Sequence, residues 1–123
     1  MADLFIDGNF TAHSGVVLPF KIDCDALTDG DLATLAKRVA RRYAFREVIG
    51  IPRGGLRFAD ALRKFVTDVP TVLLVDDVLT TGGSIEEYRA TLRAPVRGVV
   101  IIARGPCPAW ITPLFTFNDV AYG

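Results

Sequence analysis

The sequence contains few of the residues from which disulfide frameworks and protein-only metal centres are built. Its 123 residues include two cysteines and one histidine. Cys24, Cys107 and His13 are too few for a structural zinc site, and the two cysteines lie far apart in the chain. So little cysteine is typical of a reducing compartment. We therefore expect a cytoplasmic protein whose two thiols fill apolar space in the interior.

An excess of charge of one sign is absent as well, because 14 basic residues balance 14 acidic ones. Such a chain has no net field to attract a polyanion. Arg38, Arg41 and Arg42 do cluster, but apolar residues lie among them, which favours the exposed face of an amphipathic helix over a nucleic-acid patch. The sequence also shows no signal-peptide pattern and no apolar run long enough to span a membrane. We therefore expect neither nucleic acid nor a membrane as a partner.

What the sequence does contain is an alternation of short apolar runs and amphipathic segments. Strands are predicted at 47–51, 71–75 and 98–102, and helices within 28–44, 56–65 and 85–94. Thr28 or Asp29 is expected to cap the first helix. The alternation predicts an α/β fold, a small parallel sheet with flanking helices. Half of the residues are apolar, and the length suits one domain.

The two ends of the chain depart from this alternation. Pro19 interrupts the short apolar stretch at 15–25, which predicts an edge strand or a hairpin outside the main sheet. The tail from 103 to 123 holds three prolines and several aromatic residues, so we expect it to be irregular or extended.

The stretch TVLLVDDVLTTGGS, residues 71–84, places two carboxylates at the end of a predicted buried strand. Adjacent carboxylates repel each other unless a cation or a hydroxyl-bearing ligand lies between them. A sugar diol or a hydrated magnesium ion would satisfy both Asp76 and Asp77. The alternative is a solvent-exposed, turn-forming pair.

The residues after this pair open a predicted helix and suit a phosphate. They are Thr80, Thr81, Gly82, Gly83 and Ser84. Glycine lets a ligand approach the backbone N–H groups at a helix N-terminus, and the hydroxyl groups add further donors. Simple capping by Ser84 is an alternative that is compatible with phosphate binding. Together, the carboxylates and these donors predict a ribose 5-phosphate pocket at the carboxyl edge of the sheet, where ligands of α/β proteins bind.

Three segments resemble type I phosphoribosyltransferases. VLLVDDVLTTGGS closely resembles the family's phosphoribosyl-diphosphate-binding motif, and VIGIPRGGLRFADAL at 48–62 resembles its pyrophosphate loop in purine-type members. The segment at 8–36 resembles the N-terminus of orotate phosphoribosyltransferases. The resemblance implies a single domain. Its parts are a hood-like segment at 1–27, an α/β core at 28–103 and a C-terminal tail at 104–123.

The activity that the resemblance implies is transfer of ribose 5-phosphate from phosphoribosyl diphosphate to a nucleobase, orotate or a purine. Pyrophosphate is released, and Mg²⁺ is the implied cofactor. Asp76 and Asp77 would be the catalytic carboxylates and hold the ribose hydroxyls, directly or through the metal, while residues 80–84 hold the 5-phosphate. The diphosphate would lie on Pro52, Arg53, Gly54 and Gly55, with an unusual, cis or distorted, peptide bond between the first two.

The resemblance also suggests candidates for binding the base. In purine-type members an aromatic residue after the last strand stacks on the base, and Trp110 or Phe115 matches that place in this chain. Filling of the core is the alternative for these residues. His13 is a second candidate, because it lies inside the segment that resembles the orotate branch.

The chain departs from the family between the pyrophosphate-loop helix and the diphosphate-binding strand. Family members usually place another strand and a long flexible loop there, and the loop closes over the substrate. Here residues 66–70 alone separate the two elements. The short connection favours a non-catalytic sensor of phosphoribosyl diphosphate or a nucleotide, whereas the intact PRGG favours an enzyme. A receiver-like domain, which LLVDDV would also suit, is disfavoured because the acidic pair follows the second predicted strand instead of the first.

The same shortening leaves the predicted strand at 47–51 on the edge of the sheet. Exposed apolar edges are covered in stable proteins. The N-terminal segment 4–23 can provide one cover and a second chain another. We therefore expect a homodimer, which is common in the family, with N-terminal residues or the helix at 54–65 in the contact.

Overall fold

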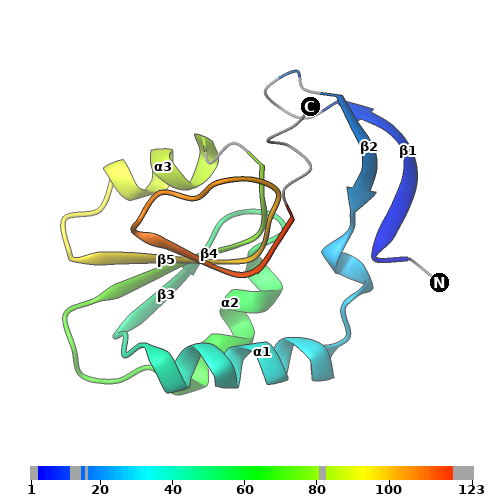
Figure 1. The fold of residues 1–123 in the computed structure, drawn as a ribbon. Coiled ribbons are helices and arrows are strands. Elements are labelled where there is room, and N and C mark those ends of the chain that lie inside the picture. The colour runs from blue at the N-terminus through cyan, green and yellow to red at the C-terminus, as the bar shows by residue number, and fades with distance from the viewer. Residues whose placement is uncertain (1–2, 12–14, 16, 81–82, 118–123) are drawn as a thin grey trace.

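The structure, a computed structural model, describes residues 3–11, 15, 17–80 and 83–117. An N-terminal hairpin stands beside a four-stranded sheet that carries helices on both faces (Figure 1). The strands are β1 (Phe5–Thr11), β2 (Val17–Ile22), β3 (Glu47–Gly50), β4 (Val72–Leu79), β5 (Val96–Ala103) and β6 (Ile111–Thr116). The helices are α1 (Asp29–Arg42), α2 (Leu56–Leu62) and α3 (Gly83–Ala90), with short 3-10 turns η1 (Cys24–Ala26) and η2 (Arg63–Phe65). None of the helices in these described ranges is long and apolar enough to cross a membrane.

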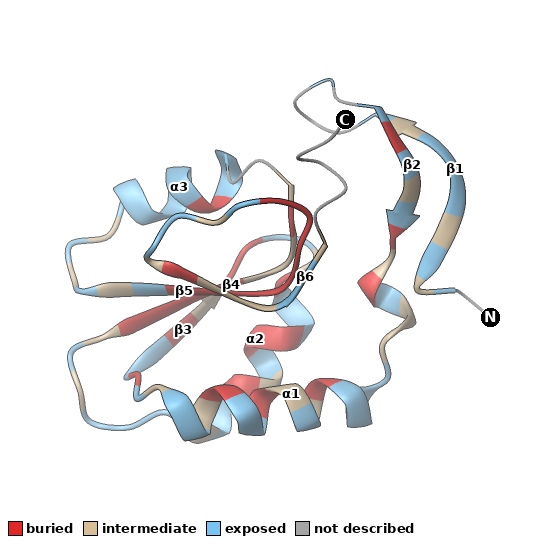
Figure 2. Cartoon of the chain, in the orientation of Figure 1, coloured by how far each residue is buried: buried red, intermediate tan, exposed pale blue. Residues whose placement is uncertain are grey.

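The main sheet is parallel throughout, as predicted, in the order β3-β4-β5-β6. Alternate residues of a strand point to opposite faces of a sheet, and both faces of this one are covered. Leu73 and Val75 of β4 pack in the core beneath α1 and α2, whereas Leu74 packs with Ile85 of α3. Figure 2 shows the result, with buried residues along the strands and on the inward sides of the helices.

Helix α1 begins where the sequence predicts. The Thr28 side chain accepts a hydrogen bond from the backbone N–H of Asp31 at 3.0 Å, and the Asp31 carboxylate accepts one from the N–H of Thr28 at 2.9 Å. This capping box satisfies two donors at the helix N-terminus. Leu32, Ala36 and Val39 recur every three or four residues, and they bury one stripe of the helix against the sheet.

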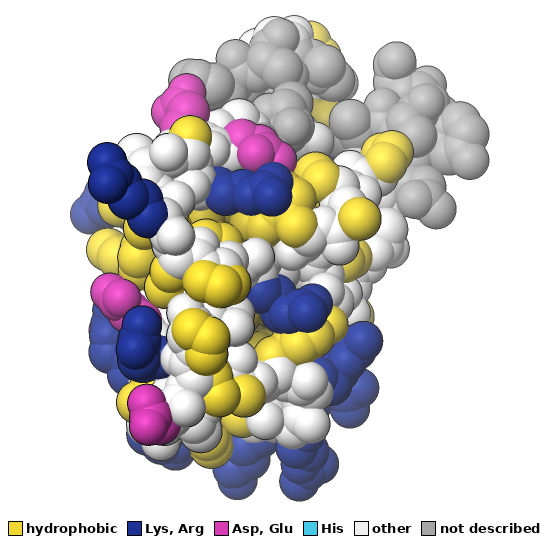
Figure 3. Space-filling model, turned by 90° about the vertical axis from the view of Figure 1, so that its left-hand side faces the viewer, with side chains coloured by type: hydrophobic (Ala, Val, Ile, Leu, Met, Phe, Trp, Pro, Cys, Tyr) yellow, Lys and Arg dark blue, Asp and Glu magenta, His cyan; other side chains and the backbone are white. Residues whose placement is uncertain are grey.

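The arginines of α1 lie on its opposite side. Arg38, Arg41 and Arg42 are exposed. Figure 3 shows Lys and Arg side chains gathered at the foot of the molecule, where α1 lies. Their position agrees with the predicted exposed face of an amphipathic helix.

The C-terminal tail is more regular than predicted, because part of it forms a fourth parallel strand. β6 pairs with β5 from Ile111 opposite Gly98 to Thr116 opposite Ala103. Pro113, which has no backbone N–H, is tolerated because β6 is the outer strand of the described sheet. The three prolines of the tail conceal this strand in the sequence.

Strand β4 is also longer than predicted, because it continues through the acidic pair to Leu79. Pairing with β5 stabilises the extension, in which Asp76 lies opposite Val100. Asp76 and Asp77 therefore belong to the sheet and not to the turn after it. A further correction concerns Ser84, which lies inside the first turn of α3 instead of capping it.

The antiparallel hairpin β1-β2 stands outside the main sheet, as predicted. Phe5, Phe20 and Phe117 attach it to the end of β6, with ring centroids 5.8 to 6.3 Å apart in edge-to-face contacts. Arg104 adds a link, since its guanidinium donates to the carbonyl oxygen of Phe20 at 2.8 Å. The hairpin thus packs at the carboxyl ends of β5 and β6, and the expectation that segment 4–23 covers the first strand of the sheet is wrong. β3 has β4 as its single strand partner within the described residues.

Replacing Phe117 with alanine is expected to loosen the hairpin without unfolding the sheet, because it removes the ring that both other phenylalanines contact. We expect the local stability of β2 to fall by about 1–2 kcal/mol. Hydrogen exchange at the amides of Val17–Ile22 should then accelerate relative to exchange in β4. Phe115→Ala is the matched control, since that side chain on β6 is 54% exposed. Equal exchange in the two variants would contradict the role given to the aromatic cluster.

Candidate functional site

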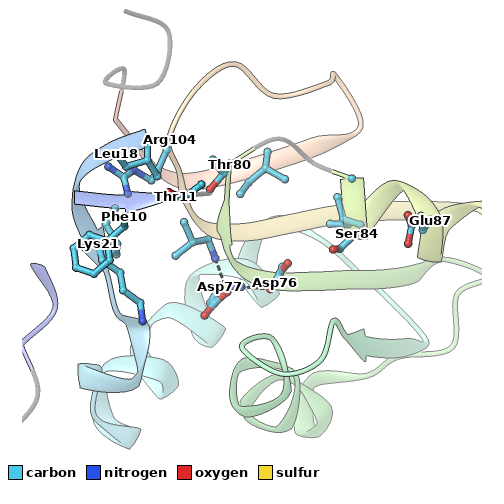
Figure 4. A pocket seen from close by; sticks show the side chains of 15 residues that line it. Phe10, Thr11, Leu18, Lys21, Asp76, Asp77, Thr80, Ser84, Glu87 and Arg104 are labelled. Carbon is cyan, nitrogen blue, oxygen red and sulfur yellow. Dashed lines mark hydrogen bonds between the residues drawn. The ribbon is translucent and has the colours of Figure 1, made fainter. Parts of the chain in front are cut away.

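The carboxyl ends of β4 and β5, the start of α3 and the hairpin enclose a pocket of about 570 Å³ (Figure 4). It lies at the edge of the sheet at which the sequence predicts a ligand. Its lining includes all of the described residues predicted for ribose 5-phosphate and several further polar or charged residues. These are Asp76, Asp77, Thr80, Gly83, Ser84, Thr11, Lys21, Glu87 and Arg104.

The two carboxylates of the acidic pair lie next to each other in the second half of β4, and both residues are half-buried. The backbone N–H of Asp77 donates to the Asp76 carboxylate at 2.8 Å, and that of Val78 donates to the Asp77 carboxylate at 2.7 Å. These bonds orient the carboxylates without neutralising them. In the part of the chain that the structure describes, no lysine or arginine forms an ion pair with either residue.

The electrostatics of the pair are unfavourable without a ligand. Burial, together with the hydrogen bond and the negative charge of Asp77, raises the pKa of Asp76 from 3.8 to about 7, although the backbone N–H of Asp77 opposes the change. Asp76 therefore gains and loses its proton near neutral pH. A cation or a pair of hydroxyl donors placed between the carboxylates would favour the charged form. This is the behaviour expected of a ligand site.

Cys24 fills apolar space in the core as predicted from the sequence, whereas Cys107 only packs against the core from its edge. Cys24 is buried, and burial and the nearby negative charges, that of Asp77 first among them, raise the pKa of its thiol to about 12. Cys107 is half-buried, and burial raises its pKa as well. Both side chains therefore remain protonated thiols at neutral pH.

The glycine loop after β3 lies directly against the acidic pair. A Cβ atom added to Gly54 would come within 2.1 Å of the Asp77 carboxylate, and one added to Gly55 within 2.5 Å of the carbonyl oxygen of Val75. Only glycine allows this close approach. The peptide bond between Pro52 and Arg53 is cis, which confirms the expectation drawn from the family resemblance. The structure thus brings the loop predicted for diphosphate to the residues predicted for ribose.

The start of α3 is open toward the pocket. A Cβ atom added to Gly83 would meet no atom of the described residues within 4 Å, so from their side a ligand can approach the backbone of the first turn. Ser84 and, from the end of β4, Thr80 carry hydroxyl groups around this opening (Figure 4). Three other predicted residues, Thr81, Gly82 and His13, lie outside the described residues.

Two cations in the pocket were missed by the sequence reasoning. Arg104 is 2% exposed; besides its bond to the Phe20 carbonyl, its guanidinium lies 4.3 Å from the centroid of the Phe20 ring. Its position directly after the apolar run of β5 could have indicated it, because the carboxyl ends of parallel strands share one edge. Lys21 lines the pocket from β2. No comparable signal marks Lys21, because the docking of the hairpin decides which of its residues face the site.

Trp110 is not brought to the pocket, contrary to the expectation that it faces a base. Its indole N–H donates to the Glu86 carboxylate at 2.8 Å, and the Arg89 guanidinium lies 4.5 Å from the ring centroid. Its carbonyl oxygen accepts from the N–H of Gly98 at 2.9 Å, near the start of β5 and so away from the carboxyl edge. Packing against α3 accounts for this residue. Phe115 is largely exposed on β6.

No protein-family model matches the sequence, and no curated protein sequence matches it either. Comparison with solved structures does find similar folds. Orotate phosphoribosyltransferase from Aeropyrum pernix superposes with a TM-score of 0.71 at 24% identity, over 97% of this chain and 92% of that chain. Adenine phosphoribosyltransferase from Leishmania tarentolae gives a TM-score of 0.66 at 15% identity, over 84% of this chain and 79% of that chain.

UMP synthase from Leishmania donovani is similar over a part of its length. The TM-score is 0.73 at 22% identity, with 95% of this chain covered. The match covers 34% of the UMP synthase chain, so this chain spans about a third of that protein. At these identities the similarity concerns the fold, and it extends over nearly the whole chain. The chain therefore has the type I phosphoribosyltransferase fold.

Proposed function

We propose that the protein is a phosphoribosyltransferase that joins ribose 5-phosphate from phosphoribosyl diphosphate to a nucleobase and releases pyrophosphate. The observation that carries the proposal is the contact between the loop at 52–55 and Asp77. This contact supports a diphosphate site next to an acidic pair that needs a ligand and near a helix N-terminus that can accept a phosphate. The enzyme would act in nucleotide synthesis or salvage in the cytoplasm.

The elements of the pocket and the neighbouring loop at 52–55 would each bind one part of the substrate. The 5-phosphate lies on the first turn of α3, near Thr80 and Ser84, and the ribose hydroxyls face Asp76 and Asp77. The diphosphate lies on the loop at 52–55. The segment at 1–27 is the hood over the α/β core, and the base lies on its side of the pocket. Orotate and the purines both stay candidates for that base.

The acidic pair fits a magnesium ion that arrives with the substrate. Within the described residues, no group of three or more His, Cys, Asp or Glu side chains forms a metal site. Asp76 and Asp77 alone would leave most positions of an octahedral ion open, and such ions usually take their other ligands from phosphates and water. When bound, the ion would offset the charge of the diphosphate. The protein's own contribution is to orient the ribose and the two phosphate groups around the reacting carbon.

A second candidate function is a non-catalytic sensor of phosphoribosyl diphosphate or a nucleotide. The favouring observation is the short connection between η2 and β4, residues 66–71, which provides no long loop to cover the pocket. A transferase must keep water away from the reacting carbon, whereas a sensor has no such need.

A panel of nucleobases separates the two functions. Orotate, adenine, guanine and hypoxanthine are each incubated with the protein, phosphoribosyl diphosphate and Mg²⁺, and pyrophosphate release is measured. Release that depends on one base supports the transferase. Tight binding without release from any base supports the sensor. Failure to bind phosphoribosyl diphosphate in calorimetry would remove both.

The expected homodimer remains a prediction. β3 is an edge strand of the described sheet, and an exposed edge favours pairing with a second chain. The hairpin packs at the carboxyl ends of the strands and not along β3, so of the two contacts proposed from the sequence the helix predicted within 54–65, which is α2 and contacts β3, is the better. Light scattering at micromolar concentration should give twice the mass of one chain, and a monomer that still turns over substrate would exclude a partner from the site.

Substitutions of two glycines should distinguish the contribution of the loop at 52–55 to ligand binding from that of the N-terminus of α3. Gly54→Ala pushes a methyl group into the Asp77 carboxylate, so binding of phosphoribosyl diphosphate should weaken at least about tenfold. Gly83→Val has open space for its side chain, so the melting temperature should stay within a few degrees of the wild-type value while ribose 5-phosphate binding is lost. Gly30→Ala on α1 is the control. A Gly83→Val variant that binds ribose 5-phosphate normally would show that the helix start does not hold the phosphate.

Binding of phosphoribosyl diphosphate with Mg²⁺ should strengthen as the pH rises through the raised pKa of Asp76, about 7. Loss of the proton supplies the second negative charge that a cation or hydroxyl donors require. We expect affinity to increase about tenfold from pH 6 to pH 8. Asp76→Asn should remove most of this increase. Because the phosphates of the substrate titrate equally with both proteins, the difference between the two pH profiles reports Asp76 alone. Identical pH profiles for the two proteins would exclude Asp76 as the titrating group.

A further inference from the structure

Within the described residues, Lys21 is the one lysine that lines the pocket. It projects from β2, where its neighbours Phe20 and Ile22 pack against the main core. Its ammonium group has no hydrogen bond or ion pair with any residue that the structure describes. A strand anchored on both sides of Lys21 therefore presents an uncompensated positive charge to the pocket.

Two other basic side chains from neighbouring elements are already engaged. Arg104 is buried and donates to the Phe20 carbonyl, so it helps to hold the hairpin in place. Arg57 of α2 donates to the Asp29 carboxylate at 3.1 Å and to the carbonyl oxygen of Leu27 at 3.0 Å. Lys21 is by contrast free to meet a ligand.

Lys21 faces the acidic pair across the pocket. In Figure 4 its ammonium group extends toward the level of Asp77, whereas Arg104 lies at the other end with Thr80. Within the described residues Lys21 forms no ion pair with either carboxylate of the pair. Gly54 touches Asp77, so a diphosphate held by the loop at 52–55 would lie beside Asp77, the residue toward whose level Lys21 extends in Figure 4.

We propose that Lys21 binds the diphosphate of phosphoribosyl diphosphate from the side opposite the loop at 52–55. The inference rests on the proposed function and assigns to the hairpin a direct part in it. Diphosphate carries several negative charges, and the loop at 52–55 holds it from one side only. An ammonium group on the opposite side completes the enclosure and forms charge-assisted hydrogen bonds with the phosphate oxygens.

The same contact assists the transfer itself. The bond between C1 of the ribose and a diphosphate oxygen breaks, and its electron pair leaves with that oxygen. The nucleobase nitrogen uses its lone pair to bond to C1, and a proton carried by that nitrogen passes to solvent. Lys21 stays protonated throughout and offsets the negative charge that grows on the leaving oxygens. Its effect is thus larger in the transition state than in the bound substrate.

The test compares two ligands that differ in the diphosphate. Calorimetry with Mg²⁺ measures binding of phosphoribosyl diphosphate and of ribose 5-phosphate to the wild type, Lys21→Gln and Lys37→Gln. Lys21→Gln should weaken phosphoribosyl diphosphate at least about tenfold and leave ribose 5-phosphate unchanged. Lys37→Gln, the same change on the exposed face of α1, should alter neither. Equal weakening of both ligands by Lys21→Gln, or no weakening, overturns the proposal.

Turnover gives a second, independent readout. With a base that the wild type accepts, Lys21→Gln should lower kcat and raise KM. Lys21→Arg, which keeps the positive charge, should bring both values part of the way back to those of the wild type. A change in KM alone would overturn the role in the transfer step. The wild-type measurements test the proposed function separately from the role of Lys21. If the wild type binds neither ligand, the proposed function is excluded. If the wild type binds both ligands and Lys21→Gln binds them equally well, only the role of Lys21 is excluded.

Discussion

The site depends on the placement of two adjacent carboxylates at the end of a strand that is otherwise apolar. Because β4 stays hydrogen-bonded to β5 through Asp76, the backbone of the pair is fixed, and the half-burial of the side chains is unavoidable. The raised pKa of Asp76 follows from that burial. So does the need for glycine at 54, since any larger residue would collide with the Asp77 carboxylate. The rest of the pocket is arranged around a negative charge that the described chain does not neutralise.

The pocket also depends on how the chain covers it. A long loop between α2 and β4 is one way to cover such a site, and this chain has a short connection there. The hairpin is held over the carboxyl ends of the strands instead by the three phenylalanines and by the hydrogen bond from Arg104.

Local features of the sequence predicted much of this arrangement. Apolar runs and helical spacing predict the parallel sheet and α1, and the composition around Asp76 and Asp77 indicates the edge of the sheet at which the pocket lies. Two kinds of feature could not be predicted. β6 was concealed because proline is unfavourable in strands except at an edge, and position in the sheet is a tertiary property. Lys21 and Trp110 were missed or misplaced because the direction of a side chain depends on how distant segments dock, which neither residue type nor spacing encodes.

The contact of Phe5 with Phe117 has a consequence for the order of events during biosynthesis. These rings come from opposite ends of the described chain, and a ribosome releases the first long before the second. Contacts so distant in sequence form late in folding, because the intervening chain must first be ordered. We expect the hairpin to wait undocked until β6 has joined the sheet. A nascent chain could therefore hold the strands from β3 to β5 in place, with their helices, and still lack a complete pocket.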